Sequence, residues 1–384
     1  MHLRKFRSYQ LFDGKDWLDE TQVLIMDEGG VVVDLVPVEE AGEDVQWVQG
    51  ILMPGMVNCH CHLELSHMQG QIPRNTGMVG FVKQVLSGRN ATTETILEAI
   101  AKAEETMIRN GIVAVGDISN THHTLLQKSK SNLHYHTFVE TTGFLPATAS
   151  SRFQQALTTY NYFLAIDGPG HQSSLVPHAP YSVSEELFRL LRDEGRGKVM
   201  TIHNQESKAE EMFFKTAQGE LSELYENLGM DISFFKPFGT GSLPAVLPRF
   251  SNSKNLLLVH NVTTSEEDLQ WMQQQEDLPP VYFCLCPNAN LYIGNGLPNL
   301  TLLRNSGYPL VLGTDSLASN SQLSIWEEIQ TLRKAFVHLP LGDFLRWATF
   351  DGACALGLQD KLGSFEKGKK PGVIEVGKEI NVLF

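Results

Sequence analysis

Hydrophobic and polar positions change their pattern near residue 51 of the chain. Beyond that point, short apolar runs rich in β-branched residues alternate with segments in which apolar residues recur every three or four positions, a pattern typical of alternating buried strands and amphipathic helices. The eight apolar runs are Met56 to Asn58, Val113 to Ile118, His134 to Thr141, Leu175 to Pro177, Val199 to Ile202, Leu256 to Val259, Val281 to Leu285 and Leu310 to Gly313. Eight strands with intervening helices predict an α/β protein with a TIM-like (β/α)8 barrel rather than an open sheet.

The two ends of the chain follow another pattern, in which short strand candidates are separated by turn-forming and acidic residues. In the first fifty residues these candidates are Val23 to Met26, Val31 to Val36 and Val45 to Met53. Residues 363–384 return to short β segments and are too few to fold alone. We therefore expect residues 1–54 and 363–384 to form one small β unit beside a barrel of residues 55–362.

Two helix starts are readable within the barrel region. The segments Ser182 to Glu185 and Thr264 to Glu267 both fit the S/T-x-x-E capping box, in which a hydroxyl and a carboxylate bind free backbone N–H groups. They predict helix N-termini capped by Ser182 and Thr264.

The charge balance limits the partners of the chain. Its 384 residues include 30 Lys and Arg against 44 Asp and Glu, a formal net charge of −14. Such a surface repels phosphate backbones and anionic lipids, so we expect neither a nucleic-acid nor a membrane partner. No run approaches the roughly 18 apolar residues that span a bilayer, and five cysteines in a chain of this size are typical of reduced thiols. These features predict a cytoplasmic protein and leave a homodimer open.

Polar side chains directly follow several of the apolar runs. In a parallel barrel the carboxyl ends of the strands meet at one rim, where catalytic side chains lie. The residues at these strand ends are His60, His62, His178, His203, His260 and Asp315. We therefore expect them to converge on one site.

A metal centre is the chemistry that this set favours. Residues two apart in an extended segment face the same way, so His60 and His62 can present both imidazoles to one ion. With His203 and Asp315 they offer three nitrogens and one carboxylate, which suits Zn²⁺, or Fe²⁺, with a position left for water. A lone strand-end histidine more often bonds to a backbone carbonyl, but four such ends on one rim favour metal binding.

Glu206 lies three residues after His203 and is close enough to reach the same rim. A carboxyl beside a bound water can move protons between that water and a substrate nitrogen. Glu210 and Glu211 lie farther on, and we interpret them as ordinary acids of a first helical turn, favoured by the helix dipole. Cys59 and Cys61 alternate with the histidines and are expected to pack toward the barrel wall.

Five ordered segments together resemble the amidohydrolase superfamily, and within it the mononuclear-metal branch of deaminases and chlorohydrolases. They are Pro54 to Glu64, His203 to Glu206, Leu258 to His260, Cys286 to Asn290 and Leu312 to Asp315. The resemblance implies a barrel with a small β-sandwich assembled from both termini. The two-metal branches carry a bridging lysine at the fourth strand, where this chain has His178, so the resemblance favours a single divalent ion, zinc before iron.

The resemblance also implies roles for the rim residues. His60, His62, His203 and Asp315 would bind the ion, and Asp315 would take a proton from the bound water. The metal-bound hydroxide would attack a carbon that carries an amino group, Glu206 would protonate the adjacent ring nitrogen, and His260 would hydrogen-bond the developing centre.

The substrate is expected to be a small heterocycle, most naturally an aminopurine base or nucleoside of the adenosine or aminodeoxyfutalosine type. His178, Glu64 and Glu140 are the residues that we expect to contact it, and segments 65–80 and 234–242 are candidates to cover the barrel mouth. The alternatives are hydrolysis of another cyclic amidine or amide, hydrolysis of a halogenated heterocycle, and a barrel that has lost catalysis and serves for binding.

Overall fold

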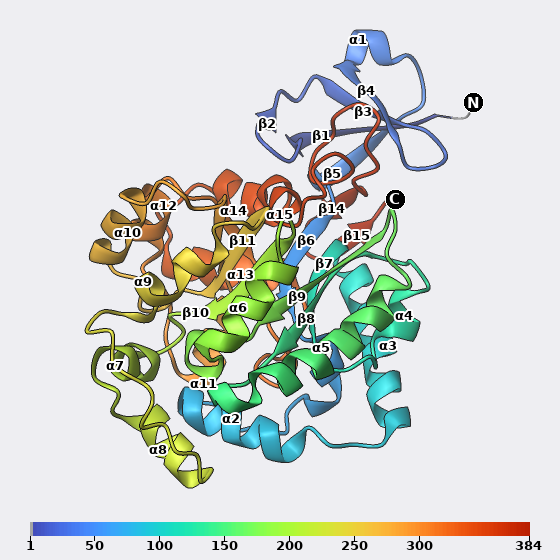
Figure 1. The fold of residues 1–384 in the computed structure, drawn as a ribbon. Coiled ribbons are helices and arrows are strands. Elements are labelled where there is room, and N and C mark those ends of the chain that lie inside the picture. The colour runs from blue at the N-terminus through green and yellow to red at the C-terminus, as the bar shows by residue number, and fades with distance from the viewer. Residues whose placement is uncertain (1–2) are drawn as a thin grey trace.

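The computed structural model describes residues 3–384, in which strands and helices alternate along most of the chain (Figure 1). All eight predicted strands are present, as β6 (Met56–Cys61), β7 (Ile112–Ser119), β8 (His134–Thr141), β9 (His171–Pro177), β10 (Val199–Asn204), β11 (Asn255–His260), β12 (Val281–Leu285) and β13 (Leu310–Leu312). The helices between and after them are α2 (Gly77–Gly88), α3 (Thr93–Arg109), α4 (Leu125–Lys128), α5 (Ala149–Leu164), α6 (Glu185–Glu194), α7 (Lys208–Thr216), α8 (Glu220–Asn227), α9 (Ser242–Val246), α10 (Glu266–Gln273), α11 (Pro287–Ile293), α12 (Leu300–Asn305), α13 (Ile325–Ala335), α14 (Leu341–Ala348) and α15 (Phe350–Ala355). Short 3-10 helices are η1 (Leu63–Met68), η2 (Pro146–Thr148), η3 (Pro180–Ser182) and η4 (Leu247–Phe250).

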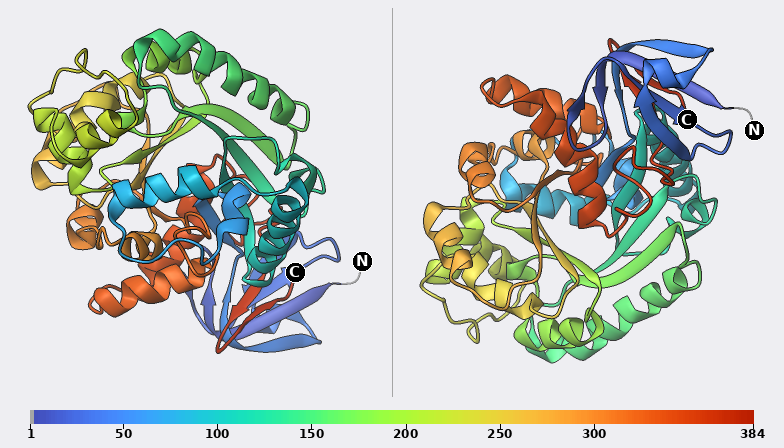
Figure 2. Two further views of the ribbon diagram at one scale, coloured as in Figure 1. Left: turned by 90° about the horizontal axis from the view of Figure 1, so that it is seen from below. Right: turned by 90° about the horizontal axis from the view of Figure 1, so that it is seen from above.

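The eight strands form two parallel sheets of four, ordered β6-β7-β8-β9 and β10-β11-β12-β13. The sheets also meet at their edges. The amide of His203 donates to the carbonyl of His178 (2.9 Å), and the amides of Thr314 and Asp315 both donate to the carbonyl of His60 (2.9 and 3.0 Å). Figure 2 shows the helices as an outer ring around these strands. All eight strands therefore point their carboxyl ends the same way.

The two ends of the chain share one sheet with its own small apolar core. Its strands are β1 (Arg4–Phe12), β2 (Trp17–Leu18), β3 (Gln22–Met26), β4 (Val32–Pro37), β5 (Val45–Met53), β14 (Ile374–Val376) and β15 (Ile380–Val382), with α1 (Val38–Ala41) after β4. β14 pairs with β5, opposing Ile374 to Met53, so the predicted union of the termini is present. Strand pairing in residues 3–384 joins these strands in a single seven-stranded sheet.

The helices after β9 and β11 start later than the sequence predicts. Ser184 caps α6 by accepting from the amide of Leu187 (3.3 Å), and Ser265 caps α10 in a reciprocal box with Asp268. The hydroxyls of the two predicted caps have other partners. Ser182 Oγ lies 2.8 Å from His178 Nδ1, and Thr264 Oγ1 donates to the side chain of Gln205 (2.7 Å). The predicted capping roles of Ser182 and Thr264 are wrong because both side chains serve the strand-end loops.

The strand ends lie far from the terminal sheet. Figure 1 shows that sheet at the upper end of the barrel region and α2, α7 and α8 at the lower end. β5 runs into β6 through Pro54 and Gly55, so the first barrel strand starts at the terminal sheet and leads away from it. None of the helices in residues 3–384 is long and apolar enough to cross a membrane.

Candidate metal centre

Three donor atoms converge where β6 and the segment after β13 end. His60 Nε2 and His62 Nε2 lie 3.2 Å apart, and Asp315 Oδ1 lies 3.6 Å from the first and 3.4 Å from the second. Ligands at about 2.0–2.1 Å from a tetrahedral ion stand about 3.3 Å from one another. The spacing of these side chains therefore fits one ion of the size of Zn²⁺.

His203 supplies a third imidazole from the end of β10. Its donor atom and those of His60 and His62 all lie within 4.8 Å of one another. His203 Nδ1 donates to the carbonyl of His178 (2.8 Å), which leaves Nε2 free to bind an ion. Ser319 Oγ likewise donates to Asp315 Oδ2 (2.6 Å) and leaves Oδ1 toward the histidines. The four predicted ligands are thus brought together and held by neighbouring groups.

Burial keeps His62 and His203 neutral. Burial, with a smaller contribution from neighbouring histidines, lowers the pKa of His62 to about 3 despite the opposing effect of Asp315. Burial and the neighbouring histidines also lower the pKa of His203 well below its usual range. Burial also raises the pKa of Asp315, but the hydrogen bond with His60 and the potential of His62 outweigh it, so the pKa lies well below its usual range. Neutral imidazole and ionised carboxylate are the forms that coordinate metals.

The backbone at the strand ends adopts conformations that residues with a Cβ seldom take. Gln205, His260, Asn261 and Asp315 have positive φ angles of 47°, 78°, 56° and 56°. Left-handed non-glycine residues cluster at functional sites, where surrounding contacts impose them. Gly313 permits the approach of β13 to β6, because a Cβ there would stand 2.9 Å from the carbonyl oxygen of His60.

Glu206 and His260 lie beside the ligand set. Glu206 Oε1 is 3.9 Å from His260 Nε2, and His260 Nδ1 donates to Asn290 Oδ1 (2.9 Å). Burial, followed by repulsion from Asp315 and Glu210, raises the pKa of Glu206 well above its usual range. Burial lowers the pKa of His260 to about 4. The pair therefore offers a proton on a carboxyl next to a neutral imidazole.

His178 and Glu140 form the side of the site toward β8 and β9. His178 is neutral, since burial lowers its pKa to about 4. Burial raises the pKa of Glu140 to about 7, and its Oε1 atom is buried without a hydrogen-bond partner. Glu140 Oε2 accepts from Asn120 Nδ2 (3.0 Å). Glu140 Oε1 lies 3.4 Å from His203 Nδ1, so this carboxyl stands directly beside one of the predicted metal ligands.

A cavity of about 660 Å³ opens above these side chains. Its floor carries His62, Glu140, His178, His203, Glu206, His260 and Asp315. One wall is a face of α2 with Phe81, Val82, Val85, Leu86 and the following Arg89, and another is a face of α5 with Arg152, Gln155, Ala156 and Thr159. The third includes Leu224, Tyr225, Leu228 and Met230 around the end of α8. Segment 65–80, predicted to cover the barrel mouth, reaches the cavity through Leu65. The other predicted cover, segment 234–242, does not line the cavity.

Glu64 does not line this cavity, contrary to prediction. Its carboxylate accepts hydrogen bonds from the amides of Asn120 and Thr121 (3.1 and 3.0 Å), from Thr121 Oγ1 (2.7 Å) and from Arg89 Nη2 (3.2 Å). Four donors leave little capacity for a ligand. The structure therefore gives Glu64 the role of fixing Arg89 and the loop after β7.

Several residues at the site escaped the sequence reasoning. Arg89 and Arg152 carry no distinctive spacing and reach the cavity only because α2 and α5 pack across it. Ser319 supports Asp315 through a loop contact that no local motif marks. Glu210 lies in the first turn of α7, as interpreted from the sequence, but it is fully buried. The one signal in the sequence that Glu210 belongs to the site was its position four residues after Glu206.

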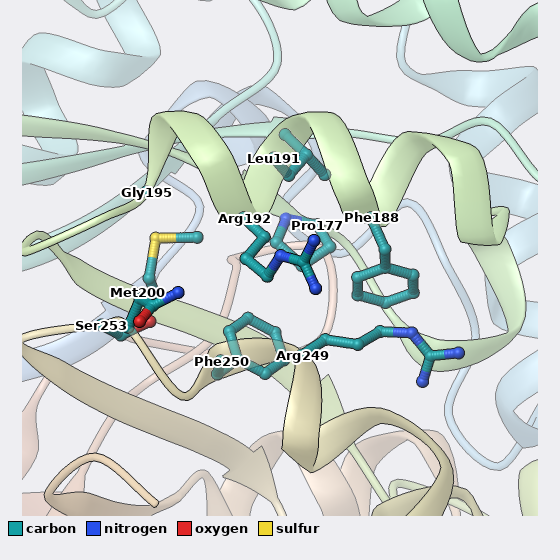
Figure 3. A pocket seen from close by; sticks show the side chains of 10 residues that line it. Pro177, Phe188, Leu191, Arg192, Gly195, Met200, Arg249, Phe250 and Ser253 are labelled. Carbon is teal, nitrogen blue, oxygen red and sulfur yellow. The ribbon is translucent and has the colours of Figure 1, made fainter. Parts of the chain in front are cut away.

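A second hollow lies outside the barrel, between α6 and the segment after η4 (Figure 3). Phe188, Leu191, Met200 and Phe250 are among the residues that line it. At about 10 Å³ it holds roughly one water molecule. It is a packing defect, so the ligand site of the described residues is the cavity above the histidines.

Comparison with known proteins places the site in context. Residues 51–378 match the model of the amidohydrolase family. The adenosine deaminase of Helicobacter pylori is 26% identical over 329 residues, which cover 83% of this chain and 77% of that protein.

Two solved structures have the same fold. Helicobacter pylori aminofutalosine deaminase, crystallised with methylthio-coformycin, superposes with a TM-score of 0.82 at 21% identity, covering 98% of this chain and 93% of that one. An adenosine deaminase from Xanthomonas campestris with bound zinc gives a TM-score of 0.72 at 22% identity, covering 96% and 83%. Both likenesses extend over nearly the whole of this chain.

Proposed function

The chain belongs to the amidohydrolase family, and from this premise we propose that it catalyses the hydrolytic deamination of an adenosine-type nucleoside. The observation that carries the proposal is the buried Glu206–His260 pair beside the ligand set, at the floor of the cavity. In this reaction water replaces the amino group on a ring carbon, and ammonia leaves. The names of the relatives, adenosine deaminase and aminofutalosine deaminase, support the same reaction class.

His60, His62, His203 and Asp315 would hold one divalent ion, zinc by the fit of their spacing. When bound, such an ion polarises water and lowers its pKa toward about 7, which makes a nucleophile available at neutral pH. Asp315 stays ionised because of the histidines around it, and Oδ1 is positioned to accept a proton from the attacking water. Ser319 holds the other oxygen of Asp315 in place.

Glu206 would act as the proton donor to the substrate. The raised pKa of its carboxyl keeps a proton on this side chain at neutral pH, available for the ring nitrogen next to the amino-bearing carbon. Protonation of that nitrogen makes the carbon more electrophilic. The proton that Asp315 accepts from water would then pass to the departing amine, and the Glu206 carboxylate would recover a proton from the new hydroxyl group as the carbonyl forms. His260, oriented by Asn290, faces the same centre with Nε2.

The cavity favours a nucleoside that carries a substituent over a free base. About 660 Å³ lies in the middle of the range of about 300–1,000 Å³ that drug-sized ligands occupy. The apolar faces of α2 and α8 lie above the floor, and Arg89 and Arg152 add positive charge to its walls. We infer that the substrate bears an apolar arm with an anionic end, whereas Glu140 and His178 contact the ring or its sugar.

Ammonia release from a panel of nucleosides tests this proposal. The zinc-loaded protein should release ammonia from adenosine-type nucleosides and no chloride from halogenated triazines. Glu206→Gln should retain about one ion per chain and lose about 100-fold or more in kcat, whereas Asp315→Asn should lose the ion. Chloride release, or ring opening without ammonia, would assign the hydroxide chemistry to another bond. No turnover of any substrate class by the wild type, together with an unchanged metal content in the Asp315→Asn variant, would argue for a binding protein.

We further propose that the two parallel sheets close into one (β/α)8 barrel of residues 55–362, and that residues 1–54 with 363–384 form a separate β-sandwich domain. The edge contacts of His60 with Thr314 and of His178 with His203 support closure. The five cysteines are free thiols, which supports a reducing, cytoplasmic environment.

A further inference from the structure

A second carboxylate lies directly behind Glu206. Glu210, in the first turn of α7, is fully buried. Its Oε1 atom accepts a hydrogen bond from the amide of Gln205 (2.9 Å), and its Oε2 atom accepts one from the amide of Glu206 (3.3 Å). One side chain thus binds two consecutive N–H groups of the loop that carries the proton donor.

The loop is held from the opposite side as well. The carbonyl of Gln205 accepts from the amide and the hydroxyl of Thr263 (3.1 and 3.2 Å). The Gln205 side chain accepts from Thr264 Oγ1 (2.7 Å) and donates to Asp268 Oδ2 (2.8 Å). The segment that follows β11 therefore fixes one side of this residue, and Glu210 fixes the other.

These contacts maintain a turn that the sequence does not favour. Gln205 has a φ of 47°, in the left-handed region that residues with a Cβ seldom adopt. Such a conformation persists where the surroundings impose it. The turn ends β10 and directs the Glu206 side chain toward His260 Nε2, at 3.9 Å. Loss of the Glu210 contacts would release the turn and move the carboxyl of Glu206.

Glu210 is not needed to start its helix. Ser207 is the N-cap of α7, and its hydroxyl accepts from the amide of Glu210 (3.4 Å). The side chain of Glu210 is therefore free for the loop, and a carboxylate with two parallel acceptors suits two adjacent N–H groups.

We propose that Glu210 is a positioning residue, which holds the Gln205–Glu206 turn so that the Glu206 carboxyl can transfer its proton to the substrate. The inference rests on the proposed function, because it acts through the role given there to Glu206. It predicts a defect in the chemical step and none in metal binding, because the Glu210 carboxylate accepts from the amides of Gln205 and Glu206 and not from any of the four proposed ligands.

Glu210→Gln is the first test. The amide keeps the size of the side chain but turns one acceptor into a donor that faces a backbone N–H. We expect kcat to fall by about 10- to 100-fold, the effect of a small misplacement of a reacting group, with KM and zinc content within about twofold of wild type. The matched control is Glu104→Gln on α3, an equally buried carboxylate that accepts from Gln127, Asn132 and Tyr135, and its kcat should be unchanged.

The double variant Glu206→Gln, Glu210→Gln separates positioning from general structural damage. If Glu210 acts through Glu206, the double variant has the kcat of Glu206→Gln alone, whereas independent effects multiply. The inference is overturned if the two losses multiply in the double variant. It is also overturned if Glu210→Gln has wild-type kcat while Glu206→Gln is inactive. In both cases the proposed function still stands. Wild-type kcat in Glu206→Gln overturns the proton-donor role and the inference with it.

Glu210→Asp provides the same test if the Gln variant does not fold. It keeps the charge but reaches only one of the two N–H groups, so its kcat should lie between those of wild type and Glu206→Gln. A wild-type kcat in folded, zinc-loaded Glu210→Asp would overturn the inference.

Discussion

The buried ion pair between Asp117 and Lys128 allows a quantitative test of how β6, the strand that ends in the His60–His62 segment, is supported. Both side chains are fully buried, and Lys128 Nζ lies 2.6 Å from Asp117 Oδ2. Asp117 Oδ1 accepts from the amide of Leu63 (2.8 Å), the residue after the proposed ligand His62. Lys128 also donates to Thr137 Oγ1 (2.8 Å). The pair therefore fixes the backbone next to His62.

Lys128→Met removes the positive charge and leaves the Asp117 carboxylate buried alone. Breaking a buried pair in this way costs about 3–5 kcal/mol of unfolding free energy. In the double variant Asp117→Asn, Lys128→Met no charge is left, and the loss is that of a few hydrogen bonds, about 1–3 kcal/mol. The double variant should therefore be more stable than the single one by about 2 kcal/mol.

Urea unfolding of the metal-loaded proteins at pH 7 measures this difference. Competition with a chromophoric chelator should also show zinc affinity at least about 10-fold weaker in Lys128→Met, since groups behind metal ligands affect affinity by about 10- to 100-fold. Lys198→Met is the matched control, because Lys198 pairs with Glu194 at 2.8 Å but both side chains are about one third exposed, and it should cost no more than about 1 kcal/mol. A single variant as stable as the double would refute the reasoning.

Three further outcomes are expected. Burial raises the pKa of Glu328 to about 8, so the folded chain keeps the proton of this carboxyl between about pH 4.5 and 8, whereas the unfolded chain releases it. The free energy of unfolding should therefore fall as pH rises through that window, by up to about 1.4 kcal/mol per pH unit. Unfolding measured at several pH values should show a flatter slope in Glu328→Gln. Arg152→Ala should raise KM for a nucleoside with an anionic arm by about 10-fold and leave KM for adenosine unchanged in steady-state assays. Chelation should abolish ammonia release, and added zinc should restore it in wild type but not in His60→Asn.

The strands and the ligand set were predictable because one physical rule governs both. A strand buried on both faces is a continuous apolar run, and all parallel strands end at one edge. His60, His203 and Asp315 could therefore be grouped without any contact information. Strand β1 was missed because its first half, Arg4 to Ser8, contains one apolar residue, Phe6, among charged and polar ones, so no apolar run marks it.

The remaining site features depend on contacts between distant segments. Glu64 was expected to face the substrate, but Arg89 and Thr121 fold back onto its carboxylate. The contact of Glu210 with the loop before it depends on a left-handed turn at Gln205, which residue preferences do not indicate. The lengths of loops determine which hydroxyl caps a helix, so Ser184 replaces Ser182. Local patterns thus specify elements, and long-range hydrogen bonds specify side-chain roles.

The direct passage from β5 into β6 has a consequence for biosynthesis. His60 and His62 leave the ribosome well before Asp315, which borders their strand. They also precede Ile374, which pairs with Met53 in the strand that runs into theirs. At about 5–20 residues per second, roughly 10–50 s separate the synthesis of the histidine pair from that of the aspartate. β7 can pair with one edge of β6 soon after synthesis, but the edge toward Asp315 stays unpaired in the nascent chain during this interval. Yield in the cell should therefore depend on chaperone capacity more than on zinc supply.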